Sequence, residues 1–202
     1  MTDAPIEREN LLTLDDLLAM GDVRVEIIEG DVQIMTAAGI EHHFLAQNIN
    51  RIIDAYVREQ DMGAVFTDGL TYLMFSETAG LKDSFVPDVS FIHKDDFPAK
   101  WDITKPFPGT PTFAVEVMSP GDKGADVQTK VRTYLSKGTR EVWVVYPRER
   151  EIHQFHRDDL ETARIYTGSK VIDISGIFPD LTITTDDVFH LPSWVQGDDQ
   201  ID

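Results

Sequence analysis

The segment from residue 112 to residue 146 restricts the fold more than any other part of the chain. Residues 112–118 and 141–146 are apolar runs typical of buried strands, and residues 125–137 have the apolar spacing of an amphipathic helix. Helix- and strand-breaking residues separate the three runs, at positions 119–122 and at Gly138. The order strand, helix, strand favours a right-handed crossover between two parallel strands. We therefore predict a protein of the α/β or α+β class, with a mixed β-sheet flanked by helices.

The rest of the chain supplies further helices and strands. Thr13 is a candidate N-cap for a short helix within residues 11–20, and Glu29-Gly30-Asp31 is a turn signal that predicts an N-terminal β-hairpin over residues 23–35. Residues 40–59 carry the clearest helical period. The remaining expected elements are strands at 64–67, 71–75 and 88–92, a proline-rich loop at 97–111, and a second hairpin at 152–156 and 162–166.

Length and composition limit the class of protein. With 202 residues, 42% of them hydrophobic, and no repeat or linker, we expect a single domain over residues 1–202, with a core from about residue 11 to 189 and an acidic C-terminal tail at 195–202. The chain contains no cysteine, so any metal must be held by oxygen or imidazole. No apolar run reaches the roughly 18 residues of a membrane span, and the first residues do not resemble a secretory signal. We therefore expect no membrane association and a cytoplasmic location.

Two carboxylates stand in apolar surroundings where an isolated charge would be costly. Glu116 lies between two valines in the first of the predicted parallel strands, and Asp88 stands at the start of another strand. A buried carboxylate needs a cation, a hydrogen bond or a metal. If the two strands are neighbours, about 5 Å apart, both side chains can face one cation. With Lys130 one crossover downstream, the set suits a metal-dependent phosphodiesterase, because two acidic groups can hold a divalent cation while a lysine positions water or offsets charge on the phosphate.

Each of these residues also has a plainer interpretation. An aspartate after a proline, as at Asp88, is often a turn or cap residue, and a strand glutamate such as Glu116 commonly lies on a solvated edge. Lys130 can be an exposed helix lysine that pairs with Asp126 four residues earlier. The combination of the three favours a functional site over these separate explanations.

Several motifs in order along the chain carry a resemblance to known proteins. They are residues 25–32, His42 at a helix start, Pro87-Asp88-Val89, residues 115–120, Asp126 with Lys130 and Tyr134, and residues 138–145. Over about residues 11–189 the chain resembles the PD-(D/E)XK nuclease superfamily and, more closely, the Uma-type putative restriction endonuclease family within it. The resemblance implies a restriction-endonuclease-like core and Mg²⁺-dependent cleavage of a nucleic-acid phosphodiester, with Mn²⁺ as a substitute metal. Asp88 and Glu116 would then hold the metal, and Lys130 would be the catalytic lysine.

The chain departs from the superfamily pattern at three positions. Met118 stands two residues after the acidic strand residue, where the superfamily commonly has its lysine. In the family that the chain resembles, this lysine has moved to the next helix, where Lys130 fits and Lys123 is the reserve candidate. Val86 replaces an arginine that relatives usually have, and Tyr146 stands where they often have an aspartate.

Further side chains are candidates for auxiliary roles. The resemblance suggests one more acidic group from the hairpin, either Glu26 or Glu29, and we favour Glu26. At most one of the two can lie near the metal, because they point to opposite faces of a strand. His42 either assists the site or makes an ordinary contact at the helix start. We expect the three tryptophans to pack against other residues and not to stack on bases: Trp101, Trp143 and Trp194.

The function that we expect is a Mg²⁺-dependent endonuclease that hydrolyses phosphodiester bonds of DNA with metal-activated water. A homodimer or higher homo-oligomer is expected, because cutting both strands usually needs two sites. The charge opposes DNA binding, since 18 Lys and Arg against 36 Asp and Glu give a net charge of -18, whereas duplex-binding proteins usually present a basic face. The alternative is a catalytically silent domain of the same fold that acts as an oligomeric binding or regulatory module. RNA, a branched nucleic acid or a small phosphodiester would suit the same chemistry.

Overall fold

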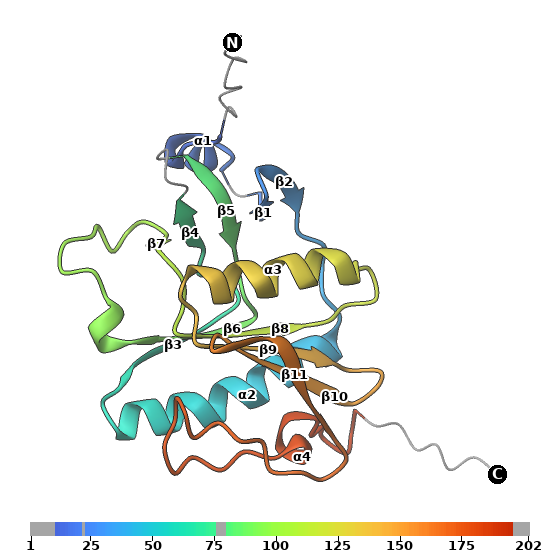
Figure 1. The fold of residues 1–202 in the computed structure, drawn as a ribbon. Coiled ribbons are helices and arrows are strands. Elements are labelled where there is room, and N and C mark those ends of the chain that lie inside the picture. The colour runs from blue at the N-terminus through green and yellow to red at the C-terminus, as the bar shows by residue number, and fades with distance from the viewer. Residues whose placement is uncertain (1–10, 22, 76–79, 196–202) are drawn as a thin grey trace, which may run out of the picture.

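The structure is a computed structural model that describes residues 11–21, 23–75 and 80–195 (Figure 1). Apart from Val195, the predicted acidic tail lies outside the described residues. The helices are α1 (Leu14–Ala19), α2 (Ile40–Glu59), η1, a 3-10 turn (Lys94–Asp96), α3 (Gly124–Lys137) and α4 (Thr185–Val188). The strands are β1 (Val25–Ile28), β2 (Asp31–Ile34), β3 (Gly63–Thr67), β4 (Tyr72–Phe75), β5 (Leu81–Phe85), β6 (Val89–His93), β7 (Phe107–Pro108), β8 (Phe113–Val117), β9 (Glu141–Tyr146), β10 (Glu151–His156) and β11 (Asp159–Thr167).

The strands of the described residues form two mixed sheets, where one mixed sheet was expected. The smaller sheet has the order β2-β1-β5-β4-β7, and the larger sheet has the order β11-β10-β9-β8-β6-β3. Strands β4 and β7 are parallel, as are β8 and β9, and the other neighbours are antiparallel. The α+β class and the parallel pair around α3 are thus confirmed, and the N-terminal hairpin belongs to a separate sheet.

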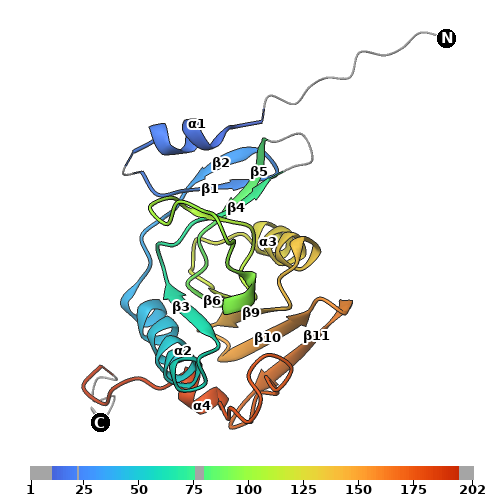
Figure 2. The ribbon, with the colours of Figure 1, turned by 90° about the vertical axis from the view of Figure 1, so that its left-hand side faces the viewer.

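Helices and sheets alternate as layers (Figures 1 and 2). Helices α2 and α4 cover one face of the larger sheet, where their apolar side chains form one core with β6, β8 and β9. Helix α3 lies between the other face of the larger sheet and the smaller sheet, because its buried side chains pack against residues of both. Helix α1 covers the far side of the smaller sheet. Helix α3 is therefore the layer that joins the two sheets.

The alternation of side chains along β8 directs Glu116 toward α3. Phe113, Val115 and Val117 pack in the core on the α2 side, whereas Ala114 packs on the α3 side. Successive side chains of a strand point to opposite faces, so Glu116 shares the face of Ala114. The same rule places Glu26 of β1 on the face of Ile28, which also packs toward α3. The two glutamates thus approach α3 from different sheets.

Most predicted elements are present near their predicted bounds. Helix α2 spans the residues that its period indicated, and Thr13 caps α1 with a capping box to Asp16. The hairpins β1–β2 and β10–β11 are confirmed. Strand β5 was not predicted, because Lys82, Asp83 and Ser84 interrupt its apolar pattern. Two of its polar side chains, Asp83 and Ser84, are nevertheless buried between β1 and β4.

The three tryptophans differ in their burial, and the lengths of the helices also bear on a membrane span. Trp143 is buried, and Trp101 is half-buried with its Nε1–H donated to Pro106 O. Trp194 is 76% exposed, with its ring edge-to-face against Phe44. Across the described ranges, no helix has the length and apolar character needed to cross a membrane.

Candidate active site

A cleft of about 520 Å³ opens where the two sheets meet the first turns of α2 and α3. Its lining comes from β1, β2, the connection 35–38, the end of β8 and the connection 118–123. The residues predicted for the site all line this cleft: Glu26, His42, Asp88, Glu116 and Lys130. The fold therefore gathers into one cavity side chains that are up to 104 positions apart in the sequence.

Asp88 and Glu116 stand at the same end of two neighbouring strands. Strands β6 and β8 are antiparallel partners, with Val89 opposite Val115, which meets the condition under which the two carboxylates were expected to come together. The backbone N–H of Val117 donates to Asp88 Oδ2 at 2.7 Å. The carboxylate of Asp88 is thereby fixed beside the residue that follows Glu116.

Lys130 joins the two sheets through buried ion pairs. Its Nζ donates to Glu116 Oε2 at 2.6 Å and to Glu26 Oε1 at 2.9 Å. All three residues are buried. Burial tends to lower the pKa of Lys130, but the charges of Glu116 and Glu26 outweigh it and hold that pKa above its ordinary value. Lys130 is therefore an ammonium cation in this arrangement and not a base.

Tyr134 is a member of the cluster that was not predicted as a site residue. Its hydroxyl donates to Glu116 Oε1 at 2.9 Å, so both oxygens of Glu116 accept a hydrogen bond. Burial raises the pKa of Glu116, the charge on Lys130 opposes this, and the charges on Glu26 and Asp88 raise the pKa further. The sequence feature that could have identified Tyr134 as a site residue is its spacing from Lys130, because residues four apart share a helix face.

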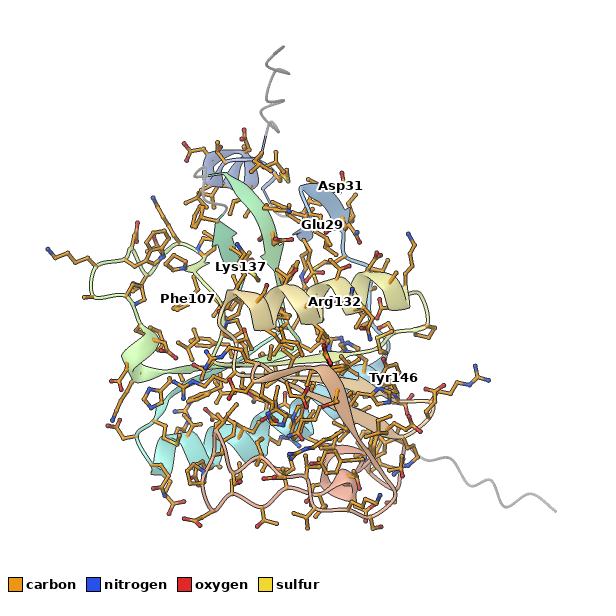
Figure 3. The ribbon with its side chains drawn as sticks, viewed as in Figure 1. Glu29, Asp31, Phe107, Arg132, Lys137 and Tyr146 are labelled. Atoms are coloured by element: carbon orange, nitrogen blue, oxygen red, sulfur yellow. The ribbon has the colours of Figure 1, made fainter. Side chains whose placement is uncertain are left out.

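The two glutamates of the hairpin have different surroundings, and the preference for Glu26 agrees with where each lies. Glu26 is buried, and its Oε1 also accepts the backbone N–H of Val86 at 2.8 Å. Glu29 is exposed in the turn between β1 and β2, where Figure 3 labels it next to Asp31. Glu26 reaches the cluster as the partner of Lys130, and Glu29 does not line the cleft.

His42 contacts the other carboxylate of the pair. Its Nε2 lies 3.2 Å from Asp88 Oδ2, and its Nδ1 is buried without a hydrogen-bond partner among the described residues. Burial lowers the pKa of His42, but the hydrogen bond and charge of Asp88 outweigh it and leave that pKa raised. The N-cap of α2 is Gly39, with no side-chain cap bond, so His42 orients Asp88 and does not cap the helix.

The remaining candidates lie at the margin of the cluster. Lys123 is exposed at the N-cap position of α3, and both it and Met118 line the cleft. Val86 is buried and contributes its backbone N–H to Glu26. Tyr146, labelled in Figure 3, ends β9 and does not line the cleft. Its ring lies against that of His153. Of the two lysines, Lys130 is the one in contact with the acidic residues.

The donor set suits a hard divalent cation. In the part of the chain that the structure describes, no group of three or more His, Asp or Glu side chains is arranged to hold a metal. Mg²⁺, however, is usually bound through one or two carboxylates while it keeps several waters. Asp88 and Glu116 supply two such carboxylates in one cleft. Lys130 pairs with Glu26 and Glu116, and the charge of Asp88 acts on Glu116, so a divalent cation would offset the surplus negative charge of these three carboxylates.

The chain thus combines a layered α+β fold with a cleft that gathers two carboxylates from one end of the larger sheet and a lysine from α3. Residues 11–186 match the model of the Uma2 family, described as "Putative restriction endonuclease", and the chain belongs to this family. The predicted family and the predicted fold class are therefore confirmed.

A solved structure has a similar fold. It is the crystal structure of a "putative nuclease belonging to DUF820" from Anabaena variabilis ATCC 29413, which superposes with a TM-score of 0.74 at 19% identity over 88% of this chain and 97% of that chain. At this identity the likeness concerns the fold. No curated protein matches the chain.

Proposed function

We propose that this protein is a divalent-metal-dependent endonuclease that hydrolyses phosphodiester bonds of DNA. The observation that carries the proposal is the meeting of Asp88, Glu116 and Lys130 in one cleft, with Lys130 Nζ 2.6 Å from Glu116. Membership of a family described as "Putative restriction endonuclease" supports nuclease activity.

Asp88 and Glu116 would hold Mg²⁺, with Mn²⁺ as a substitute. When bound there, the cation would supply a Lewis acid for a phosphoryl oxygen and lower the pKa of a water molecule. The protein prepares the two donors for this role. Val117 N–H and His42 orient Asp88, while Tyr134 and Lys130 orient Glu116.

Lys130 would act as a fixed positive charge. Because neighbouring carboxylates keep its pKa high, it can donate hydrogen bonds to water or to a phosphate oxygen but cannot accept a proton at neutral pH. Glu26 has a separate role in this scheme. It holds Lys130 from the smaller sheet, so that the lysine keeps one partner when Glu116 turns toward a cation.

The partners of the protein follow from the same proposal. DNA would be the substrate, and a homodimer or higher homo-oligomer would bring two clefts to the two strands. The cytoplasm is the compartment in which such a nuclease would meet DNA.

One observation favours a second candidate function. The net charge of -18 opposes binding of a polyanion, and a catalytically silent domain of this fold, acting as an oligomeric binding or regulatory module, would not need to overcome it. Such a domain would bind Mg²⁺ without cleaving any nucleic acid.

The test combines metal binding with cleavage. The wild type and Glu116→Gln are titrated calorimetrically with Mg²⁺ and Mn²⁺, and each is assayed on supercoiled, linear and single-stranded DNA. Glu141→Gln is the matched control, because Glu141 is also a buried strand glutamate but lies outside the cleft lining. We expect cleavage that needs metal, is lost in Glu116→Gln and persists in Glu141→Gln. Cleavage by Glu116→Gln at the parent rate would refute the mechanism, and metal binding without cleavage would favour the silent module.

A further inference from the structure

We infer that the cleft takes DNA as an unpaired segment, single-stranded or locally opened, whose bases lie against an uncharged wall beside the two carboxylates. The inference rests on the proposed nuclease function and names its substrate class. The uncharged wall consists of residues 34–38, which connect β2 to α2 and line the cleft: Ile34, Met35, Thr36, Ala37 and Ala38.

The uncharged wall offers a surface for bases. Ile34 ends β2, the edge strand of the smaller sheet, and its side chain is 73% exposed. A single exposed apolar residue is ordinary on a protein surface. Here, however, five consecutive uncharged residues border the same cavity as Asp88 and Glu116. Unstacked bases expose flat faces that proteins bind with aromatic or apolar side chains, whereas the bases of a duplex are stacked on one another.

The charges around the cleft disfavour a duplex. Six carboxylates line it: Glu26, Asp68, Asp88, Glu116, Asp122 and Asp126. Of the lysines and arginines in the lining, Arg24 pairs with Asp68, Lys130 pairs with two glutamates, and Lys123 is the one without an ion pair among the described residues.

A duplex and a single strand make different demands on such a lining. A duplex carries one negative charge per about 1.7 Å, and the proteins that bind it neutralise phosphates with lysines and arginines. A single strand carries about half that charge density, so that it needs fewer cations to bind. The lining therefore suits a short, unpaired strand whose affinity comes partly from its bases.

The depth of the two carboxylates in the cleft also favours an unpaired strand over a duplex. Glu116 and Asp88 have side chains only 10% and 12% exposed, at the inside of a cleft of about 520 Å³. That volume lies in the range of small-molecule pockets, about 300–1,000 Å³. A duplex is stiff, with a persistence length of about 150 base pairs, so it does not bend sharply enough to carry one phosphate into such a cleft. A flexible single strand can bend inward and bring one phosphate to the carboxylates.

The experiment compares three labelled substrates of one sequence in Mg²⁺ and in Mn²⁺. They are a single-stranded oligonucleotide, the blunt duplex, and the duplex with an unpaired internal gap. Ile34→Asp places a charge on the wall, and Val32→Asp is the matched control, because Val32 is an exposed residue of the same strand outside the cleft lining. Glu116→Gln reports contaminating nuclease.

We expect kcat/KM for the unpaired substrates to exceed that for the blunt duplex by about tenfold or more, the equivalent of about 1.4 kcal/mol. Ile34→Asp should raise KM for the single strand about tenfold and leave kcat within about twofold, because the wall binds the substrate without taking part in the reaction. Val32→Asp should leave both constants unchanged.

Three outcomes would overturn the inference. Equal or faster cleavage of the blunt duplex, lost in Glu116→Gln, would establish the nuclease and remove the preference for unpaired DNA. Equal effects of Ile34→Asp and Val32→Asp would remove the wall from the binding site. Absence of cleavage on every substrate in either metal would overturn the nuclease proposal and this inference together.

Discussion

Replacing Lys130 by methionine should destabilise the protein more than a change at any exposed lysine. The lysine lies 2.6 Å from Glu116 and 2.9 Å from Glu26, and all three residues are buried. Methionine keeps most of the length of the side chain but removes its charge. Two buried carboxylates would then face each other without a cation.

The size of the effect follows from the loss of the shared partner. Removing one member of a buried ion pair costs about 3–5 kcal/mol, because it leaves an uncompensated buried charge. The free energy of unfolding of a domain is about 5–15 kcal/mol, so the loss is a large share of the total. For a chain of this size, each kcal/mol lowers Tm by about 2–4 °C, which gives an expected decrease of about 6–20 °C.

Urea unfolding in the presence of a chelator, followed by tryptophan fluorescence, measures this free energy, and the slope m checks that the unfolding transition is unchanged. Lys123→Met is the matched control. That lysine lines the same cleft but is exposed, so its replacement should change stability by no more than about 0.5 kcal/mol. A loss below about 1 kcal/mol in Lys130→Met would refute the reasoning, because it would mean that the ion pairs behave as solvent-exposed ones.

Three further substitutions test other parts of the structure. Burial raises the pKa of Glu141 to about 7 from 4.5, so the native state binds more protons than the unfolded state between these values and stability falls as pH rises through them. The free energy of unfolding of Glu141→Gln, measured in urea, should therefore exceed that of the parent by about 3 kcal/mol at pH 8 and by little at pH 4.5. A variant that is less stable than the parent at pH 8 would contradict this. Tyr134→Phe should lower the free energy of unfolding by about 1.5–3 kcal/mol, because Glu116 loses a charge-assisted hydrogen bond while the ring contact with Phe85 remains. An unchanged midpoint of urea unfolding would contradict this. Gly63→Ala should lower Tm by several degrees, because an added Cβ would lie 2.1 Å from the carbonyl oxygen of Ile92 at a φ of +155°, and an unchanged melting curve would rule out that clash.

Periodicity predicted the elements whose side chains alternate cleanly between core and solvent. Helices α2 and α3 were identified in this way from their apolar spacing, whereas β8 and β9 were identified as continuous apolar runs, and both strands are buried on both faces. Strand β5 has no such pattern, because Asp83 is buried to accept the backbone N–H of Glu29. The second sheet escaped prediction for the same reason, since β5 is the strand that joins the hairpin β1–β2 to β4.

The acidic pair of the candidate site was predictable, but the details of its contacts were not. Asp88 and Glu116 stood out as carboxylates in apolar strands, and Lys130 followed from its place after the crossover. The sequence does not show that Glu26, 104 positions before Lys130, is a second partner of the lysine. That contact depends on how the smaller sheet is placed over α3, which is decided by packing between distant segments. The burial of Tyr134 against Glu116 depends on the same packing.

The position of α3 between the two sheets sets a fixed spacing inside the protein. An α-helix with its side chains is about 10–12 Å across, so the sheets cannot approach each other to compensate for a shortened residue on that helix. Glu26 belongs to the smaller sheet and Glu116 to the larger sheet, and Lys130 forms an ion pair with each of them. The length of the side chain at position 130 therefore decides whether one cation can contact both glutamates. A shorter cationic side chain at this position would leave one of the two carboxylates without a contact.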